Sequence, residues 1–313
     1  MSRRIRSLVV AAFALLPLAL CCAGCGYAQL FGAAVGSATT SETGMLYVGA
    51  GFAELAAKQE SLGLKTEAEQ SARNAIAVYE RADSQHAAFW LAYSNQVLGL
   101  ILKSDVTRSA EAADRLGRAV SLFERLGDDG LPYLVTSLGH LGTFFVDRGD
   151  VERAEPLLQR ALQLSEQHVI PYDNETKGKC LHNMGVVRLL QGKQELALSF
   201  FEDAIGELNG VGASESAQMA NALNGKAFVL FKAGNQDEAA ALMVQAAKIA
   251  EKSLGAESPE LAKMQYDLAC VYGAMGRRDD ARALCMRSLA IYTKHFGAES
   301  AEAVRVSEKM RSL

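Results

Sequence analysis

Small residues recur at one spacing through most of this 313-residue chain. The recurring landmarks are glycines, namely Gly63, Gly149, Gly192, Gly234 and Gly276. An alanine follows five residues after each one, namely Ala68, Ala154, Ala197, Ala239 and Ala281. Seven residues further on stand Ala75, Ala161, Ala204, Ala246 and Ser288. Seven residues before each glycine stand Ala56, Gly142, Gly185, Ala227 and Ala269. Five coincident phases about 42 residues apart indicate an array of structural repeats.

Each repeat is predicted to be two antiparallel helices, A and B. The glycine permits the left-handed conformation that ends helix A. The small residues lie where the helices cross, so that the two axes can approach closely. One such pair cannot bury its own apolar face, and stacked neighbours bury it instead. The pattern therefore predicts an all-α solenoid.

The motif in each unit resembles the tetratricopeptide repeat. The third unit matches throughout, with Leu138, Leu141, Gly142, Phe145, Gly149, Ala154, Leu158 and Ala161. Three positions depart from the pattern: Gln59 and Arg188 replace an aromatic residue, and Lys226 replaces a leucine. The period is similar to the 42-residue repeats of kinesin light chains, as are the linkers Leu254–Glu260 and Phe296–Ser300.

The resemblance implies a right-handed superhelix of about six helix pairs. The units are expected near residues 49–92, 93–134, 135–177, 178–219, 220–261 and 262–300. Residues 301–313 are expected to form a capping helix. The second unit is irregular, because Ala112 and Ala119 are in phase but Lys103–Ser109 stands where the turn glycine is expected.

The inner face of helix A is the candidate binding site, because this phase binds peptides in the family. If Leu181, Met184 and Gly185 face the core, then helical periodicity turns His182 and Asn183 to the groove. Carried through the units, the predicted groove set is Thr136, His140, Thr143, Lys179, His182, Asn183, Asn221, Asn224, Phe228, Lys263, Tyr266 and Asp267.

The chemistry of this set fits a polypeptide partner. Amide side chains both donate and accept hydrogen bonds, so they can pair with a peptide backbone. Phe228 and Tyr266 would supply apolar anchors. The alternative is a solvated groove without a ligand. The carboxylate clamp of the family is not reproduced, although Lys179 and Lys263 stand at a suitable phase. His140 and His182 supply too few ligands for a metal site, and we expect neither metal nor cofactor.

The first residues have the features of an export signal. Arg3, Arg4 and Arg6 precede the apolar run Leu8–Leu20, which is short for a membrane span. Ala23 and Gly24 precede Cys25 and resemble a bacterial lipobox, although Cys22 stands where leucine is usual. We therefore expect residues 1–24 to be removed and Cys25 to be lipidated. Cleavage after Ala28 and an uncleaved anchor are the alternatives.

The residues between Cys25 and the repeats are rich in glycine, alanine, serine and threonine, so 25–44 is predicted to be a flexible tether. Removal of residues 1–24 leaves 29 basic against 36 acidic side chains. A chain without a clustered basic face is not expected to bind nucleic acid. Cys180, Cys270 and Cys285 are expected to be small buried hydrophobic residues, with a Cys270–Cys285 disulfide left open.

The sequence predicts a binding protein and not an enzyme, because it contains no metalloprotease, nucleophile-elbow or P-loop motif. The first hypothesis is a lipoprotein on the periplasmic face of a membrane, which is expected to be the outer membrane since Gly26 and not aspartate follows Cys25. It would position a protein partner, for instance during assembly of an envelope complex. The alternatives are a regulatory adaptor on an uncleaved anchor and a small-ligand receptor or enzyme with a site across repeats.

Overall fold

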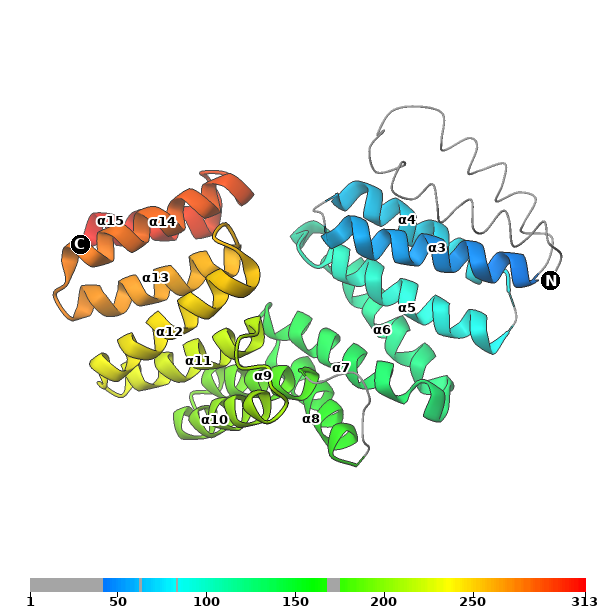
Figure 1. Cartoon of the computed structure of the whole chain (residues 1–313), viewed down its shortest axis with the longest axis horizontal. Coiled ribbons are helices and arrows are strands. Elements are labelled where there is room, and N and C mark those ends of the chain that lie inside the picture. The colour runs from blue at the N-terminus through cyan, green and yellow to red at the C-terminus, as the bar shows by residue number, and fades with distance from the viewer. Residues whose placement is uncertain (1–41, 62–63, 83, 168–174) are drawn as a thin grey trace. The chain divides into compact units, whose positions relative to one another are not determined.

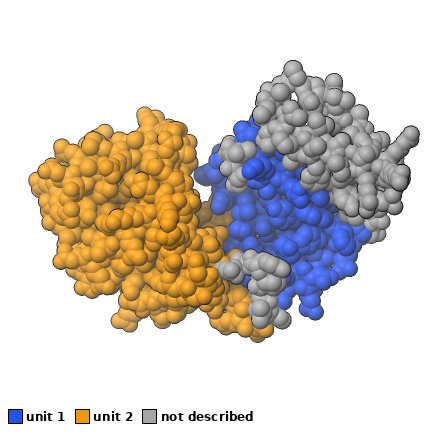
Figure 2. Space-filling model, viewed as in Figure 1, with its two compact units in different colours: residues 1–141 blue, residues 142–313 orange. Residues whose placement is uncertain are grey.

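A computed structural model describes residues 42–61, 64–82, 84–167 and 175–313. The described residues contain helices and no strand, which confirms the all-α prediction. The chain divides into two compact units, residues 1–141 and 142–313 (Figure 2). The predicted signal peptide, Cys25 and nearly all of the predicted tether lie outside the described residues.

Unit 1 contains two helix pairs and the beginning of a third. The pairs are α3 (Glu42–Ser61) with α4 (Lys65–Tyr79), and α5 (Gln85–Leu102) with α6 (Ser109–Arg125). Helix α7 (Leu131–Val146) begins in unit 1 and ends in unit 2 (Figure 1). Because α3 begins before Gly44, where the tether was predicted to end, this end of the tether is helical.

Unit 2 continues the array. After α8 (Val151–Gln167) come the pairs α9 (Thr176–Leu190) with α10 (Gln194–Gly210), α11 (Ala217–Lys232) with α12 (Gln236–Leu254), and α13 (Pro259–Ala274) with α14 (Arg278–Phe296). Helix α15 (Ala301–Ser312) packs against α14, as expected of the capping helix. The described part of the chain therefore has the predicted order of six helix pairs and a final helix.

The turn glycines end helix A as predicted. Gly149, Gly192, Gly234 and Gly276 have φ angles of 69°, 75°, 93° and 77°. The next residue bonds back across each turn, as the Asp150 amide does to the Phe145 carbonyl at 2.9 Å. This bond from the second residue past the helix satisfies a carbonyl that would otherwise lack a partner. Gly63, the fifth turn glycine, lies outside the described residues.

In two repeats of unit 2, a large side chain of helix B lies against a glycine of helix A. A Cβ atom on Gly142 would lie 2.7 Å from Leu158, and one on Gly185 would lie 2.6 Å from Phe201. Phe201 also faces Gly225 on the following helix A, where a Cβ would lie 2.5 Å away. Its fully buried ring therefore joins two successive repeats. Bulk added at any of these glycines has no room.

The linker between repeats caps the next helix A. Ser216, Ser258 and Ser300 each accept a hydrogen bond from the backbone N–H three residues later, at the start of α11, α13 and α15. This cap satisfies an amide that would lack a partner at the helix start. Lys294 of α14 pairs with Glu257 of the linker at 2.6 Å, and Lys252 of α12 pairs in the same way with Glu215.

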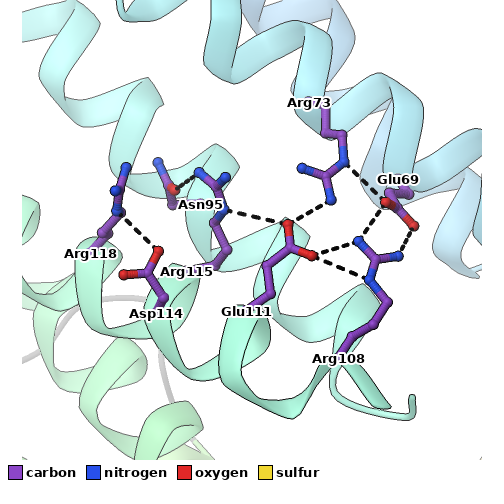
Figure 3. A network of polar contacts seen from close by, with 8 residues as sticks. All are labelled: Glu69, Arg73, Asn95, Arg108, Glu111, Asp114, Arg115 and Arg118. Atoms are coloured by element: carbon purple, nitrogen blue, oxygen red, sulfur yellow. Dashed lines mark hydrogen bonds and ion pairs between the residues drawn. The ribbon is translucent and has the colours of Figure 1, made fainter. Parts of the chain in front are cut away.

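The irregular turn of unit 1 carries an arginine that joins α4 to α6 (Figure 3). Arg108 lies in the short 3₁₀ turn Val106–Arg108 and donates to both carboxylate oxygens of Glu69, at 2.7 and 2.8 Å. It also binds Glu111 at 2.7 Å, and Arg73 bridges Glu69 and Glu111 at 3.0 and 2.6 Å. We call these four side chains the seam quartet. Paired charges on two neighbouring B helices hold their spacing here.

The seam quartet should make unit 1 sensitive to acid. The hydrogen bonds from Arg108 hold the pKa of Glu69 and of Glu111 below the usual 4.5. A lowered pKa gives stability that is complete above about pH 4.5 and is lost as pH falls through the lower folded pKa. We expect thermal melting of unit 1 to depend less on pH below 4.5 in the variant with Glu69→Gln and Glu111→Gln than in wild type. The exposed Glu251→Gln in α12 is the control, and equal acid sensitivity of all three proteins would contradict the assignment.

Candidate partner-binding face

The A helices of unit 2 lie closer to one another than its B helices do. Helix α11 contacts both α9 and α13, whereas α10, α12 and α14 make no comparable contacts with one another in the described residues. A stack whose elements are closer on one side curves toward that side. The surface of α9, α11 and α13 is therefore the concave face of unit 2, which is where the sequence predicts the groove.

Two of the predicted groove amides are not open to a ligand. Asn183 and Asn224 are each only 5% exposed. The amide of Asn183 donates to the Thr143 hydroxyl on α7 at 2.7 Å, and the amide of Asn224 donates to Asp267 on α13 at 2.8 Å. These bonds join successive A helices. The donors that the sequence analysis assigned to a peptide backbone are thus used within the repeat stack.

The carbonyl side of Asn224 remains unsatisfied. Asp267 fixes the orientation of the amide, because a carboxylate accepts only from its N–H group. The opposite oxygen, Oδ1, is covered and has no hydrogen-bond partner. A buried polar atom without a partner costs about 1–3 kcal/mol. The hydrogen bond between Asn224 and Asp267 therefore joins α11 to α13, but it leaves a buried oxygen whose lost hydration lowers the stability of the stack locally.

His182 lies at the same phase as Asn224, on α9. Its half-buried ring packs 5.3 Å from the Phe201 ring, and its Nδ1 atom is covered without a partner. Burial, followed by the positive charges of Lys263 and Lys179, lowers the pKa of His182 to about 3. The imidazole is therefore neutral at physiological pH. The two charges that lower its pKa, Lys263 and Lys179, are positive, and the Asp267 carboxylate lies on the same face.

The remaining candidates of unit 2 lie around this centre. Phe228 is 37% exposed with Lys232 against its ring, and Asn221 and Lys179 are half-buried. Lys263 is exposed. Tyr266 is half-buried, and Arg305 of α15 lies 5.4 Å from its ring centre. The capping helix therefore borders the face beside α13.

Two candidates belong to unit 1. Thr136 and His140 lie on the first part of α7 and are half-buried. The sequence analysis missed Gln96 on α5, which accepts a hydrogen bond from the buried Ser137 hydroxyl on α7. This hydrogen bond joins successive A helices in unit 1, as the hydrogen bonds of Asn183 and Asn224 do in unit 2.

Cys270 and Cys285 are free thiols and form no disulfide with each other. Cys180 and Cys285 are buried and Cys270 is half-buried, which agrees with their assignment as small hydrophobic residues. Burial raises the pKa of Cys270 and of Cys285 above the usual value. Among the helices of the described residues, none is long and apolar enough to cross a membrane.

Comparison with known proteins decides the family. A family model of the tetratricopeptide repeat matches residues 133–206 and 218–294. Residues 133–206 and 218–294 are tetratricopeptide repeats. This repeat fold is generally non-catalytic and typical of protein–protein interaction. A search of the curated proteins finds no match to the chain.

Solved structures share the repeat fold. A tetratricopeptide-repeat protein from Parabacteroides merdae aligns over 99% of this chain and 98% of its own, with 13% identity and a TM-score of 0.61. BtubC (BKLC) from P. vanneervenii covers 65% of this chain and 82% of its own, with 20% identity and a TM-score of 0.55.

Proposed function

We propose that this tetratricopeptide-repeat protein is an exported, lipid-anchored scaffold that holds a polypeptide partner against the concave face of unit 2. The observation that supports the partner site is that this face is held in place by hydrogen bonds and carries exposed side chains. Helices α9, α11 and α13 are tied to their neighbours by part-buried hydrogen bonds, and they expose Phe228 on α11 and Lys263 on α13. A pre-ordered surface loses little conformational entropy when a partner binds.

The structure changes which groups the partner would use. The side-chain N–H groups of Asn183 and Asn224 are used in hydrogen bonds within the stack. We therefore assign recognition of the partner to the ring of Phe228, to Asn221 and to the positive side chains of Lys179 and Lys263 near His182. An aromatic anchor in a partly covered position contributes strongly to binding. Positive charge on this face of an otherwise acidic protein would favour a partner segment that carries negative charge.

The location rests on the N-terminal residues. Basic residues, a short apolar run and the sequence Ala23-Gly24-Cys25 support export, cleavage before Cys25 and attachment of acyl chains to its thiol. Such a protein would face the periplasm, and Gly26 would direct it to the outer membrane in enteric-type sorting. Cleavage after Ala28, which would leave a soluble exported protein, is the competing outcome.

The anchor is tested by metabolic labelling with palmitate in a bacterial host. We expect label in the wild-type protein and none in Cys25→Ala, because only Cys25 follows the small residues at the cleavage site. Cys180→Ala, which changes a buried thiol of α9, is the control and should keep the label. Equal labelling of wild type and Cys25→Ala would remove the lipoprotein proposal and leave the partner site untouched.

The partner site is tested by affinity purification with variants of exposed positions only. Phe228→Ala and Lys263→Glu should each reduce recovery of a specific partner by about tenfold, as expected for loss of about 1.4 kcal/mol at a contact residue. Met286→Ala, an exposed apolar residue on α14, is the matched control. Recovery of every partner at wild-type level by both face variants would refute the concave-face assignment.

A further inference from the structure

Unit 1 contains a pocket of its own. It has a volume of about 570 Å³ and lies along the seam between α4 and α6, with α5 at its floor. It is lined by Glu80, Leu91, Asn95, Asp114, Gly117, Arg118, Ser121, Leu122 and Arg125. Pockets of about 300–1,000 Å³ commonly hold small ligands.

The seam quartet joins α4 to α6 near the pocket, although its four side chains do not line it. Glu69 and Arg73 of α4 are bound to Arg108 and Glu111 at the start of α6. Arg115, the next residue on this face of α6, donates to the buried Asn95 at 3.2 Å, which places the end of the network at the pocket floor (Figure 3). The Nε atom of Arg115 is buried and has no hydrogen-bond partner. The pocket is therefore formed before any ligand arrives.

Gly117 is not explained by packing within the chain. A Cβ atom at this position would meet nothing within 4 Å. Glycine inside a helix costs about 1 kcal/mol relative to alanine, so its presence in the middle of α6 is unfavourable for the helix alone. Because Gly117 lines the pocket and has no side chain, a ligand there could approach the backbone of α6.

The charges on the rim define the ligand. Arg118 is paired with Asp114 at 3.1 Å, so these two charges compensate each other. Glu80 and Arg125 line the same pocket, and neither takes part in an ion pair of the described residues. One negative and one positive group thus remain available beside the apolar surface of Leu91 and Leu122.

We propose that this pocket binds a small zwitterion of the amino-acid or dipeptide class. Its ammonium group would bind Glu80, its carboxylate would bind Arg125, and an aliphatic side chain would cover Leu91 and Leu122 beside Gly117. Arg–carboxylate pairs are among the stronger polar contacts available to such a ligand. This site lies outside the face assigned to the protein partner, so either assignment can fail without the other.

Calorimetric titration of the whole chain with glycyl-leucine tests the site. N-acetyl-glycyl-leucine lacks the ammonium group and glycyl-leucinamide lacks the carboxylate, and each should bind at least about tenfold more weakly than glycyl-leucine. Arg125→Gln should weaken glycyl-leucine but leave glycyl-leucinamide unchanged, and Glu80→Gln should show the reverse pattern with the acetylated peptide.

Gly117→Leu fills the pocket and should abolish binding. Gly206→Leu on α10 is the matched control, because a Cβ there also meets nothing within 4 Å and both changes replace a helical glycine. Circular dichroism confirms that both variants fold. Absence of glycyl-leucine binding to the wild-type chain, equal binding of the capped peptides, or undiminished binding by a folded Gly117→Leu would each overturn the proposal.

Discussion

Phe201→Ala is expected to lower the free energy of unfolding of unit 2 by about 3–5 kcal/mol. The Phe201 ring is fully buried and fills the space between Gly185 of α9 and Gly225 of α11. Neither glycine has a side chain that can move into the cavity, so little of it can collapse. The His182 ring, 5.3 Å from Phe201, would also lose its packing partner. Urea denaturation followed by circular dichroism measures the change.

Phe200→Ala is the matched control for this prediction. Phe200 is the adjacent residue of α10 and is half-buried, with Arg188 lying 5.7 Å from its ring centre. The same atoms are removed, but water and the Arg188 side chain can occupy the space. A loss of stability as large for Phe200→Ala as for Phe201→Ala would show that the ring does not join the two repeats.

The repeat architecture could be predicted because it depends on residue size at fixed spacing. A position such as Gly142 tolerates no Cβ once Leu158 occupies the crossing, and Gly185 meets the same limit against Phe201, whereas Ala227 and Ala269 show that a single methyl group fits in the later units. The turn glycines could also be predicted from the sequence, since a φ of 69–93° at these positions strongly favours glycine. Such constraints act within one helix pair, so the local sequence contains them.

The binding face could be predicted only in part. Helical periodicity assigned His182 and Asn224 to one side of helix A, but it could not show which residues lie opposite them. The partner of Asn224 is Asp267, 43 positions later in the chain, and the partner of Asn183 is Thr143, 40 positions earlier. Whether an amide is free depends on the register between neighbouring repeats, which one helix does not reveal.

The residues that depart from the repeat motif also could not be interpreted from one helix alone. Gln59 accepts a hydrogen bond from Ser71 at 2.7 Å, Arg188 binds Glu155 at 2.7 Å, and Lys226 binds Glu202 at 2.8 Å. Each residue replaces an apolar residue of the family pattern with a polar contact to a B helix. In each case the polar residue and its partner on the B helix act as a pair, so neither residue can be interpreted alone. Arg108 was the hardest of these residues to predict, because it lies in the irregular turn of the second repeat, which does not match the motif.

Ala204→Trp should disrupt the packing of unit 2 around α10. Ala204 has no exposed surface and lies in a core with Leu181 of α9 and Leu223 of α11. An indole ring there would force apart two helices that the neighbouring repeats hold in place. Overpacking by a few methylene groups costs about 1–3 kcal/mol, and a tryptophan adds far more volume. Because repeats stabilise one another through their interfaces, the loss should spread to α9 and α11 before it reaches α14.

Hydrogen exchange measures that spread. We expect amides of α9, α10 and α11 to lose protection in Ala204→Trp while those of α14 keep more of theirs. Asp203→Trp is the control, because Asp203 is exposed on the same helix and a ring there remains in solvent. Unchanged protection of α10 in Ala204→Trp would mean that the small residue is not needed at the crossing. The close approach of the helices would then require another cause.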